Sequence, residues 1–386
     1  MKIETLNDSS KKTAIIAADI HLLKKPGMWG RAEIAGDDIF ALQQIVDIVK
    51  EYDADLYLLG DVLDSVTNLP RPLVVAQQLL EPLITAGHKV RYIQGQHEIV
   101  VQAHYNNYPW MSLVSGTEHM AERQFNFLGK HAYAFDYFSE TFELERLAKI
   151  PENTEVLFMH GTAAEVFPMA AHFSLANIPQ HVRTIFAGDY HVATEYKEDS
   201  GRILIYTGST RLTACDESPD KSVIMASLTD EGLLQYQRLP LKSRTVVKYS
   251  ELPKLILERG KLPEDTELPE QLRKPVILIN QPIDRVEYVR LAEYSHLYST
   301  SGASPNSSCE MIIEDVERQT DEEILARYVD REKYPEEFAF TLDIIQNPID
   351  NALKRLRDKL GILDDDFNIK MPAAVAQTEE TKINLE

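Results

Sequence analysis

Six short motifs in the first part of the chain combine acidic residues, histidines and amides with glycines. They are Asp19-Ile20-His21, Gly60-Asp61-Val62-Leu63-Asp64, Gly95-Gln96-His97-Glu98, His160-Gly161, Gly188-Asp189-Tyr190-His191 and Tyr206-Thr207-Gly208-Ser209. Divalent metal ions take oxygen and imidazole ligands, and a bridging carboxylate holds two ions roughly 3.5 to 4 Å apart. Such a pair generates a hydroxide at neutral pH, aligns a phosphorus atom with it and neutralises the leaving oxygen. The residue types therefore predict a two-metal phosphoesterase, with Asp61 as the bridge.

An apolar run precedes each of the first five motifs. The runs are Thr13 to Ala18, Leu56 to Leu59, Val90 to Ile93, Val156 to Met159 and Ile185 to Ala187. Short apolar runs bounded by glycine or polar residues are typical of buried strands, and open α/β folds place ligands at the carboxyl ends of their strands. We therefore expect the motifs to converge on one rim.

The remaining pattern predicts an α/β fold in which two sheets lie between helical layers. Helices are expected at Asp38–Tyr52, Arg71–Ala86 and Ser139–Ala148. From Thr184 to Leu239 the pattern favours consecutive strands, with a hairpin at Asp199-Ser200-Gly201 because glycine tolerates positive φ. The proline-rich stretch Pro253–Pro275 indicates a domain junction.

The motifs resemble the signature of calcineurin-like metallophosphoesterases, which is D-x-H, G-D-x-x-D, G-N-H-[DE], a lone His-Gly and G-H-x-H. The similarity extends from Asp19 to His191 with two departures, and within the superfamily it is strongest to the SbcD-type nucleases of bacteria and phages. Trp29 and Arg31 follow the first motif, Tyr206–Thr213 resembles the segment that closes the site, and a long region follows the catalytic part. The resemblance is specific over about residues 13 to 240.

The resemblance implies a role for each motif residue. One ion would be held by Asp19, His21, Asp61 and His191, and the other by Asp61, Gln96, His160 and Asp189. His97 would lie over the scissile phosphate as an acid or a charge stabiliser, and Asp64 would fix its tautomer. The expected cofactors are two divalent ions, Mn²⁺ first and Mg²⁺ as the alternative.

Gln96 and Asp189 are the two departures, because the signature has Asn and His at these positions. A glutamine oxygen can still coordinate, although its side chain is one methylene longer. A carboxylate suits hard ions such as Mn²⁺ and Mg²⁺, so we expect a retuned metal preference. The alternative is a weakened or inactive site.

The implied architecture is a four-layer α/β/β/α metallophosphoesterase sandwich with a small α+β cap and a C-terminal helical segment that docks a partner. The expected boundaries are 1–245 for the nuclease domain, 246–320 for the cap, 321–364 for the docking segment and 365–386 for a disordered tail. In the cap, Val276–Ile279, Arg285–Tyr294 and Met311–Val316 suggest a β-α-β unit, and Tyr298–Ser308 suggests a polar loop.

The implied function is that of a Mn²⁺-dependent DNA exonuclease and endonuclease subunit of an SbcCD-like complex, acting at DNA ends in repair and recombination. Its expected partners are double-stranded ends, single strands and hairpins of DNA, an SbcC-like coiled-coil ATPase, and a second copy of the chain. The dimer would form through helices before residue 120, with Tyr105 to Trp110 as candidate contacts.

The last predicted helix carries apolar residues in a heptad pattern. They are Ile349, Leu353, Leu356, Leu360 and Leu363. This spacing fits docking on a coiled coil, and it fits a helix packed on its own domain equally well.

Composition favours a cytoplasmic protein. The chain of 386 residues has no apolar stretch of the ~20 residues that a membrane span needs, and its two cysteines, Cys215 and Cys309, suggest a reduced compartment. A net charge of −21 argues against a simple nucleic-acid binder. We expect the metals to supply local positive charge and a partner to supply most of the grip on DNA; the alternative is that the acidic residues only solvate the surface.

Two rival functions stay open. One is a phosphoesterase for small molecules or phosphoproteins on the same fold, which would need neither a cap nor a docking helix. The other is a non-catalytic scaffold subunit, against which the intact motif residues argue. Four histidines outside the motifs, His104, His119, His131 and His172, receive no metal role.

Overall fold

The computed structural model describes residues 6, 11–23, 37–66, 70–99, 108–137, 143–213, 217–252, 256, 262 and 266–299. The chain divides into two compact units, one of residues 1–282 and 286–304 and the other of residues 283–285 and 305–386. The second unit falls almost wholly outside the described residues. The expected strand Met311–Val316, the heptad helix with Ile349 to Leu363 and the tail from residue 365 therefore lie outside them as well.

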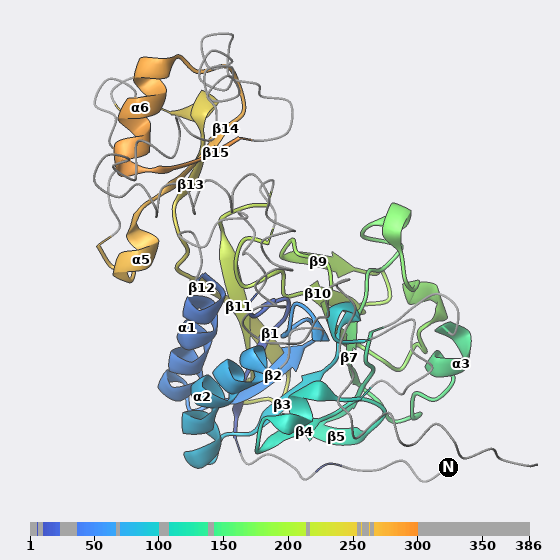
Figure 1. The fold of residues 1–386 in the computed structure, drawn as a ribbon. Helices are drawn as coiled ribbons and strands as arrows, with labels where there is room; N and C mark the ends of the chain where they lie inside the picture. The colour runs from blue at the N-terminus through green and yellow to red at the C-terminus, as the bar shows by residue number, and fades with distance from the viewer. Residues whose placement is uncertain are drawn as a thin grey trace, which may run out of the picture. The chain divides into compact units, whose positions relative to one another are not determined.

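The first sheet has six strands in the order β12-β11-β1-β2-β3-β4 (Figure 1). The strands are β1 (Thr13–Ala17), β2 (Asp55–Leu59), β3 (Val90–Ile93), β4 (Thr117–His119), β11 (Lys221–Leu228) and β12 (Leu234–Leu241). β1 to β4 run parallel to one another, whereas β11 is antiparallel to both β1 and β12. The carboxyl ends of β1, β2 and β3 therefore share one edge.

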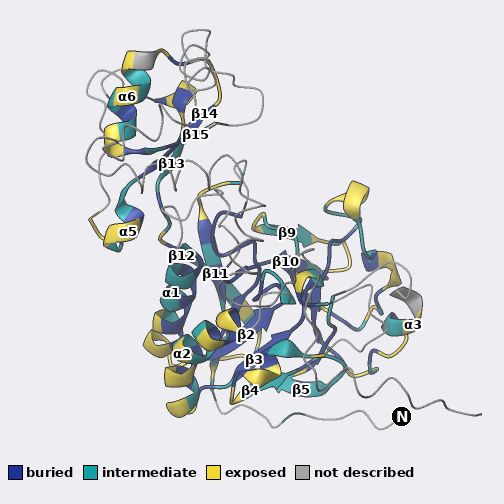
Figure 2. Ribbon diagram, in the orientation of Figure 1, coloured by how far each residue is buried: buried dark blue, intermediate teal, exposed yellow. Residues whose placement is uncertain are grey.

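Two helices, α1 (Asp37–Glu51) and α2 (Arg71–Thr85), cover one face of this sheet (Figure 1). Alternate residues of a strand point to opposite faces. Ile15 and Ala17 of β1 accordingly pack with the buried side of the helices, while Ile16 packs with the second sheet. The helices turn exposed residues outward (Figure 2), as amphipathic surface helices do.

The second sheet also has six strands, in the order β5-β6-β7-β8-β10-β9. They are β5 (Gln124–Phe127), β6 (Lys130–Ala134), β7 (Val156–His160), β8 (Thr184–Gly188), β9 (Thr194–Lys197) and β10 (Ile203–Tyr206). The central four are parallel, and β5 and β9 run antiparallel at the edges. Its inner face meets the first sheet through rings such as Tyr57 and Phe158, whose centroids are 5.6 Å apart.

The outer face of the second sheet is covered by α3 (Glu143–Leu147) and by short 3₁₀ helices. Leu157 and Met159 of β7 pack there with Leu147, Leu175 and Ile178. The short helices of the chain are η3 (Gln96–Glu98), η4 (Trp110–Leu113), η6 (Pro168–Ala170), η7 (Leu175–Asn177) and η8 (Tyr249–Glu251). Helices, sheet, sheet and helices thus form the expected four-layer α/β/β/α order, and the fold class is confirmed.

A third sheet of three parallel strands follows, in the order β13-β14-β15. It comprises β13 (Val246–Lys248), β14 (Val276–Ile279) and β15 (His296–Ser299), with α5 (Glu270–Arg273) before β14 and α6 (Arg285–Tyr294) after it. The expected β-α-β unit is therefore present, but its second strand is β15. The prediction of a polar loop over Tyr298–Ser308 was wrong for Tyr298 and Ser299, which belong to β15. The domain boundaries at 245, 320 and 364 stay predictions.

Most element bounds agree with the sequence pattern within a residue or two, and the hairpin between β9 and β10 is confirmed. Gly201 has φ +84°, and its N–H donates to Glu198 O at 2.9 Å. Of the expected helix Ser139–Ala148, the described residues show α3, Glu143–Leu147. β4, β5 and β6 were not predicted. Among the described residues, no helix combines the length and apolar character that a membrane crossing requires.

Candidate metal centre

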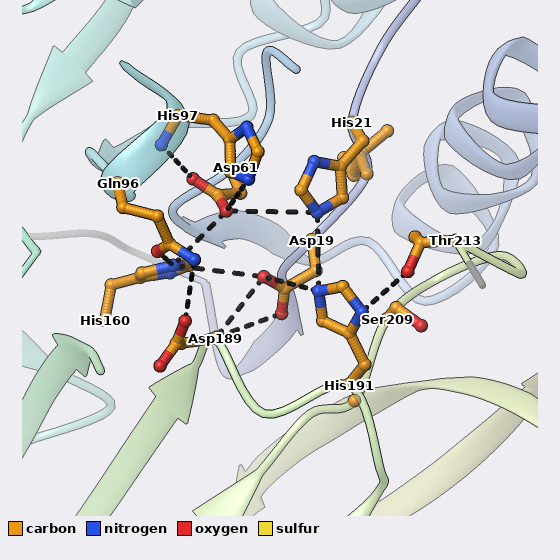
Figure 3. Close-up of polar contacts among 12 residues, drawn as sticks. Asp19, His21, Asp61, Gln96, His97, His160, Asp189, His191, Ser209 and Thr213 are labelled. Atoms are coloured by element: carbon orange, nitrogen blue, oxygen red, sulfur yellow. Dashed lines mark hydrogen bonds and ion pairs between the residues drawn. The ribbon is translucent and has the colours of Figure 1, made fainter. Parts of the chain in front are cut away.

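The motif residues converge, as expected, at the carboxyl ends of β1, β2, β3, β7 and β8 (Figure 3). Asp19, Asp61 and His160 are completely buried. Three groups of residues could each hold a metal ion, because the ligand atoms within each group all lie within 4.8 Å of one another. The groups are Asp19 with His21 and His191, His21 with Asp61 and His97, and Asp19 with Asp61 and His160. The groups share residues, which is expected of a site where two ions have a ligand in common.

Asp61 belongs to two of these three groups. Its Oδ2 lies 3.6 Å from His160 Nε2 and 3.9 Å from Nε2 of both His21 and His97. Oδ1 accepts from the His97 N–H at 3.0 Å, whereas the buried Oδ2 has no hydrogen-bond partner among the described residues. Buried carboxylate oxygens are normally paired or coordinate metals. Because three imidazole nitrogens lie within 4 Å of this oxygen, the residues fit a pair of divalent ions that Asp61 could contact together.

Three histidines are oriented by a partner on Nδ1. His160 Nδ1 donates to Leu59 O at 2.6 Å, His97 Nδ1 lies 2.9 Å from Asp64 O, and His191 Nδ1 lies 2.8 Å from a carboxylate oxygen of Glu217. A donor bond from Nδ1 leaves the lone pair on Nε2, which is the form that binds a metal. All three rings therefore present Nε2 to the centre.

Asp64 was expected to fix the tautomer of His97. The structure brings the two residues into contact through the main-chain carbonyl oxygen of Asp64. The carboxylate instead lies 3.2 Å from Nδ1 of His21. The turn after β2 brings both groups of Asp64 to histidines, and the motif spacing could not distinguish them. The His97 side chain is 40% exposed, so a substrate can reach it.

Gln96 and Asp189 contact each other. Gln96 Oε1 lies 2.7 Å from His160 Nε2, and Gln96 Nε2 donates to Asp189 Oδ1 at 2.7 Å. The other Asp189 oxygen accepts from the Thr162 hydroxyl and lies 3.1 Å from His172 Nδ1. Asp189 belongs to none of the three candidate metal groups found in the described part of the chain.

Glu217 was missed by the sequence analysis. Its carboxylate contacts His191, accepts from Ser209 Oγ at 3.0 Å and from Lys221 Nζ at 2.6 Å, and also pairs with Thr213. Burial raises the pKa of Glu217, but His191 and Lys221 outweigh burial and hold that pKa well below its usual range. The only signal in the sequence was an acidic residue shortly after the closing segment Tyr206–Thr213.

Several site residues have a backbone conformation that is rare outside glycine. The φ angles are 55° at Asp19, 49° at His21, 49° at Asp61 and 85° at Asp189. Such residues persist only where the surroundings hold them, and they gather at functional sites. The buried Arg211 supplies part of that hold by donating to Ile20 O at 2.9 Å and to His21 O at 2.8 Å.

The glycines of the motifs allow close packing around the ligands. A Cβ on Gly95 would lie 2.0 Å from Asp61 Oδ1, and a Cβ on Gly60 would lie 2.3 Å from His160 Nδ1. Gly60 also has φ +85°. Larger residues at either position would displace a ligand.

Burial and crowding perturb the titration of the ligands. Burial raises the pKa of Asp19 to about 6 and lowers the pKa of His21 to about 4. Burial also lowers the pKa of His160, but the carboxylates of Asp61, Asp19 and Asp189 outweigh it and raise that pKa to about 10. Protons and divalent ions therefore compete for these groups, and metal binding should release protons.

Other residues singled out in the sequence lie away from this cluster or beyond the described residues. His119 pairs with Asp136 at 2.8 Å, and His131 is exposed. Tyr108 and Trp110 contact each other edge to face with centroids 5.0 Å apart. The following lie outside the described residues: Trp29, Arg31, His104, Tyr105, Cys215, Cys309, Ile349, Leu353, Leu356, Leu360 and Leu363.

Comparisons with known proteins found similar structures but no similar sequence. No protein-family model matches the sequence, and no curated protein matches it. The chain is similar to a dimetal phosphatase from Danio rerio, at TM-score 0.38 and 12% identity, over 56% of this chain and 93% of that one. It is also similar to a 5'-nucleotidase from Candida albicans, at TM-score 0.32 and 13% identity, over 62% of this chain and 52% of that one.

Proposed function

We propose that this chain is a phosphoesterase that uses two divalent ions. The observation that carries the proposal is the buried Oδ2 of Asp61, which has no hydrogen-bond partner among the described residues and belongs to two of the three overlapping ligand groups. Asp19, His21 and His191 would hold one ion with Asp61, and Gln96 and His160 would hold the other with it. When bound, the ions would activate water and neutralise charge on the phosphate.

His97 is the residue placed to act on the leaving group. Asp64 O fixes its Nδ1, and its Nε2 lies 3.9 Å from Asp61 Oδ2 on the exposed side of the cluster. A protonated Nε2 would donate to the leaving oxygen or stabilise its negative charge. His97 lies within one candidate metal group, and its exposed ring suits a substrate contact better than the buried ligands do.

For the substrate we propose DNA. Phe167 is 37% exposed and stacks on Tyr190, the residue between Asp189 and His191, with ring centroids 6.1 Å apart and an interplanar angle of 28°. Tyr190 in turn contacts the buried ring of Tyr206 at 5.5 Å. An exposed aromatic face beside the centre supports stacking of an unpaired base, which is how proteins commonly hold single strands. A monoesterase whose substrates carry no base would have no use for it.

The substrate class can be tested directly. The purified chain, loaded with Mn²⁺ and in parallel with Mg²⁺, would be given linear duplex DNA, a single-stranded oligonucleotide, bis(p-nitrophenyl) phosphate and a phosphomonoester. We expect cleavage of both DNA substrates and of the diester, with the highest rate in Mn²⁺. Activity confined to the monoester would support the small-molecule or phosphoprotein alternative, and activity on none of them would support the scaffold alternative.

The aromatic stack can be tested without catalysis. Binding of an all-thymine oligonucleotide and of an abasic strand of equal length would be compared in EDTA by fluorescence anisotropy. Stacking contributes about 1–3 kcal/mol per base, so Phe167→Ala should remove a preference of roughly 5- to 150-fold for the strand with bases. Tyr52→Ala is the matched control, because Tyr52 is equally exposed and follows α1 at the opposite end of the parallel strands. Equal losses in both variants would count against the proposal.

The assembly is likewise proposed. The heptad residues support docking on an SbcC-like coiled-coil ATPase in the cytoplasm, and Tyr105 to Trp110 support a homodimer. Each buried leucine contributes roughly 1.5 to 3 kcal/mol, so Leu353→Asp with Leu356→Asp should abolish the complex while leaving basal cleavage intact. A loss of thermal stability in that double variant would show that the helix packs on its own chain. A monomer mass by light scattering at micromolar concentration would contradict the dimer.

A further inference from the structure

The Asp189 carboxylate belongs to none of the three candidate metal groups found in the described residues. Both of its oxygens are engaged by the protein: Oδ1 accepts from Gln96 Nε2 at 2.7 Å, and Oδ2 accepts from the Thr162 hydroxyl and lies 3.1 Å from His172 Nδ1. Its main-chain N–H, turned by the φ of 85°, donates to Asp19 Oδ2 at 3.2 Å. Figure 3 shows the carboxylate below Gln96 and His160, with the amide group between it and the Asp61 side of the cluster.

We infer that Asp189 is a positioning residue that orients the Gln96 amide, and that Gln96, not Asp189, coordinates the second ion. This inference rests on the proposed function. A side-chain amide has an oxygen, which accepts hydrogen bonds and can bind a cation, and an NH₂ group, which only donates. An ionised carboxylate only accepts hydrogen bonds, so it selects the amide nitrogen and turns Gln96 Oε1 toward the centre.

The contacts around His160 support this orientation. Gln96 Oε1 lies 2.7 Å from His160 Nε2, and the same Nε2 lies 3.6 Å from Asp61 Oδ2. The amide oxygen, the imidazole nitrogen and the bridging carboxylate therefore face one region. If the amide rotated by 180°, its NH₂ group would face that region and could not bind a cation.

The surroundings hold Asp189 in place for this role. Thr162 follows the His160-Gly161 motif, and its main-chain N–H donates to His172 Nδ1 at 3.0 Å. His172 Nε2 contacts the Tyr137 hydroxyl at 3.2 Å. These residues form a chain of contacts that ends on Oδ2 of Asp189, whereas Gln96 contacts Oδ1. Residues that orient a metal ligand typically contribute 10- to 100-fold to metal affinity.

The test requires crystals of the full chain soaked in Mn²⁺, with ion positions taken from anomalous scattering. Bonds between hard divalent cations and oxygen are about 2.0–2.6 Å long. We expect two ions, one of them within that distance of Gln96 Oε1, with both Asp189 oxygens farther away and still bonded to Gln96 and Thr162. An ion bonded directly to Asp189 would overturn the inference and leave the proposed function standing. An absence of ions from the centre would overturn the proposed function itself.

A donor and acceptor exchange gives a second, independent readout. Gln96→Glu places two carboxylates against each other, and Asp189→Asn replaces one of the two acceptor oxygens by a donor, so residue 189 no longer selects the amide nitrogen alone. In the double variant the new amide at 189 can donate to the new carboxylate at 96, so the hydrogen bond returns with reversed polarity. Isothermal titration with Mn²⁺ should show the weaker site reduced about 10- to 100-fold in Asp189→Ala and Asp189→Asn, and largely rescued in the double variant.

The first site provides the internal control, because Asp19, His21 and His191 do not contact the Gln96 amide in the described structure. Its affinity should change little in any of these variants, and melting curves in EDTA would show whether each variant folds. An unchanged second site in Asp189→Ala, or a double variant no better than its worse single variant, would overturn the inference.

Discussion

Replacing Glu217 should weaken binding of the ion that we propose His191 holds, although Glu217 belongs to none of the candidate metal groups in the described residues. Its Oε1 lies 2.8 Å from His191 Nδ1 and keeps the ring oriented with Nε2 toward Asp19. Loss of a residue that orients a ligating histidine typically costs 10- to 100-fold in metal affinity. We therefore expect Glu217→Ala to raise the dissociation constant of that ion by this factor, which corresponds to about 1.4–2.7 kcal/mol.

The same substitution should also destabilise the fold, for a separate reason. The Lys221 side chain is 3% exposed, and its ammonium group donates to Glu217 at 2.6 Å and to Ser209 at 2.8 Å. Removing one partner of a buried pair leaves an uncompensated charge and costs about 3–5 kcal/mol. Glu217→Ala combined with Lys221→Met removes both charges, so it should recover much of that stability.

The two effects can be separated by measuring both quantities in both variants. Urea denaturation in EDTA gives the free energy of unfolding, and Mn²⁺ titration gives the affinities of the two ions. We expect the double variant to regain stability but to keep the weakened affinity. If the affinity recovered together with the stability, Glu217 would act only through the fold, and the argument for orientation of His191 would be refuted.

Three further substitutions have expected outcomes. His97→Ala should keep both ions and lower diester cleavage by ~10²- to 10⁴-fold, since it removes a proton donor; loss of manganese from the anomalous map would identify His97 as a ligand instead. Gly95→Ala should displace Asp61 and cost at least one ion in a Mn²⁺ titration, because a Cβ there lies 2.0 Å from Asp61 Oδ1, whereas Gly87→Ala, which has open space, should cost only ~1–2 kcal/mol of backbone strain. Burial raises the pKa of Glu98 from its ordinary value of 4.5 to about 8. Glu98 therefore binds its proton more tightly in the folded protein than in the unfolded chain. The stability that this proton contributes in EDTA is complete below about pH 4.5 and is lost as the pH rises to about 8. Unfolding of Glu98→Gln should show a flatter dependence over that window, and identical slopes would contradict this origin.

The architecture followed from local signals in the sequence. Buried parallel strands are nearly all apolar, as in Leu56–Leu59 and Val156–Met159, so their runs were visible and their carboxyl ends could be assigned to one rim. The strands β4, β5 and β6 were missed because each is short or mixes polar with apolar residues, as in Gln124–Phe127. β4 and β6 also pair with strands that are more distant in sequence, β3 and β7, whereas β5 pairs, in the described part of the chain, only with the adjacent β6.

The site was predictable as a set of residues and less so as a set of contacts. Motif spacing identified Asp19, His21, Asp61, His160 and His191 because each follows a recognisable strand. The contact of Asp64 with His97 depends on a turn that directs the main-chain carbonyl toward the ring, and the partnership of Glu217 with His191 depends on a segment that folds back after β10. Both are tertiary contacts that no local pattern encodes.

Gln96 and Asp189 appeared in the sequence as two separate departures, and the structure shows them as a single contact. Glutamine is one methylene longer than the expected asparagine, and aspartate is shorter than the expected histidine, so the two changes compensate in length. The two side chains are joined by a hydrogen bond of 2.7 Å, so the length of the side chain at one position determines which side chain fits at the other. Shortening residue 96 alone would break the contact, and enlarging residue 189 alone would push against the amide. The retuned metal preference predicted from the carboxylate at 189 therefore depends on what that carboxylate does to Gln96.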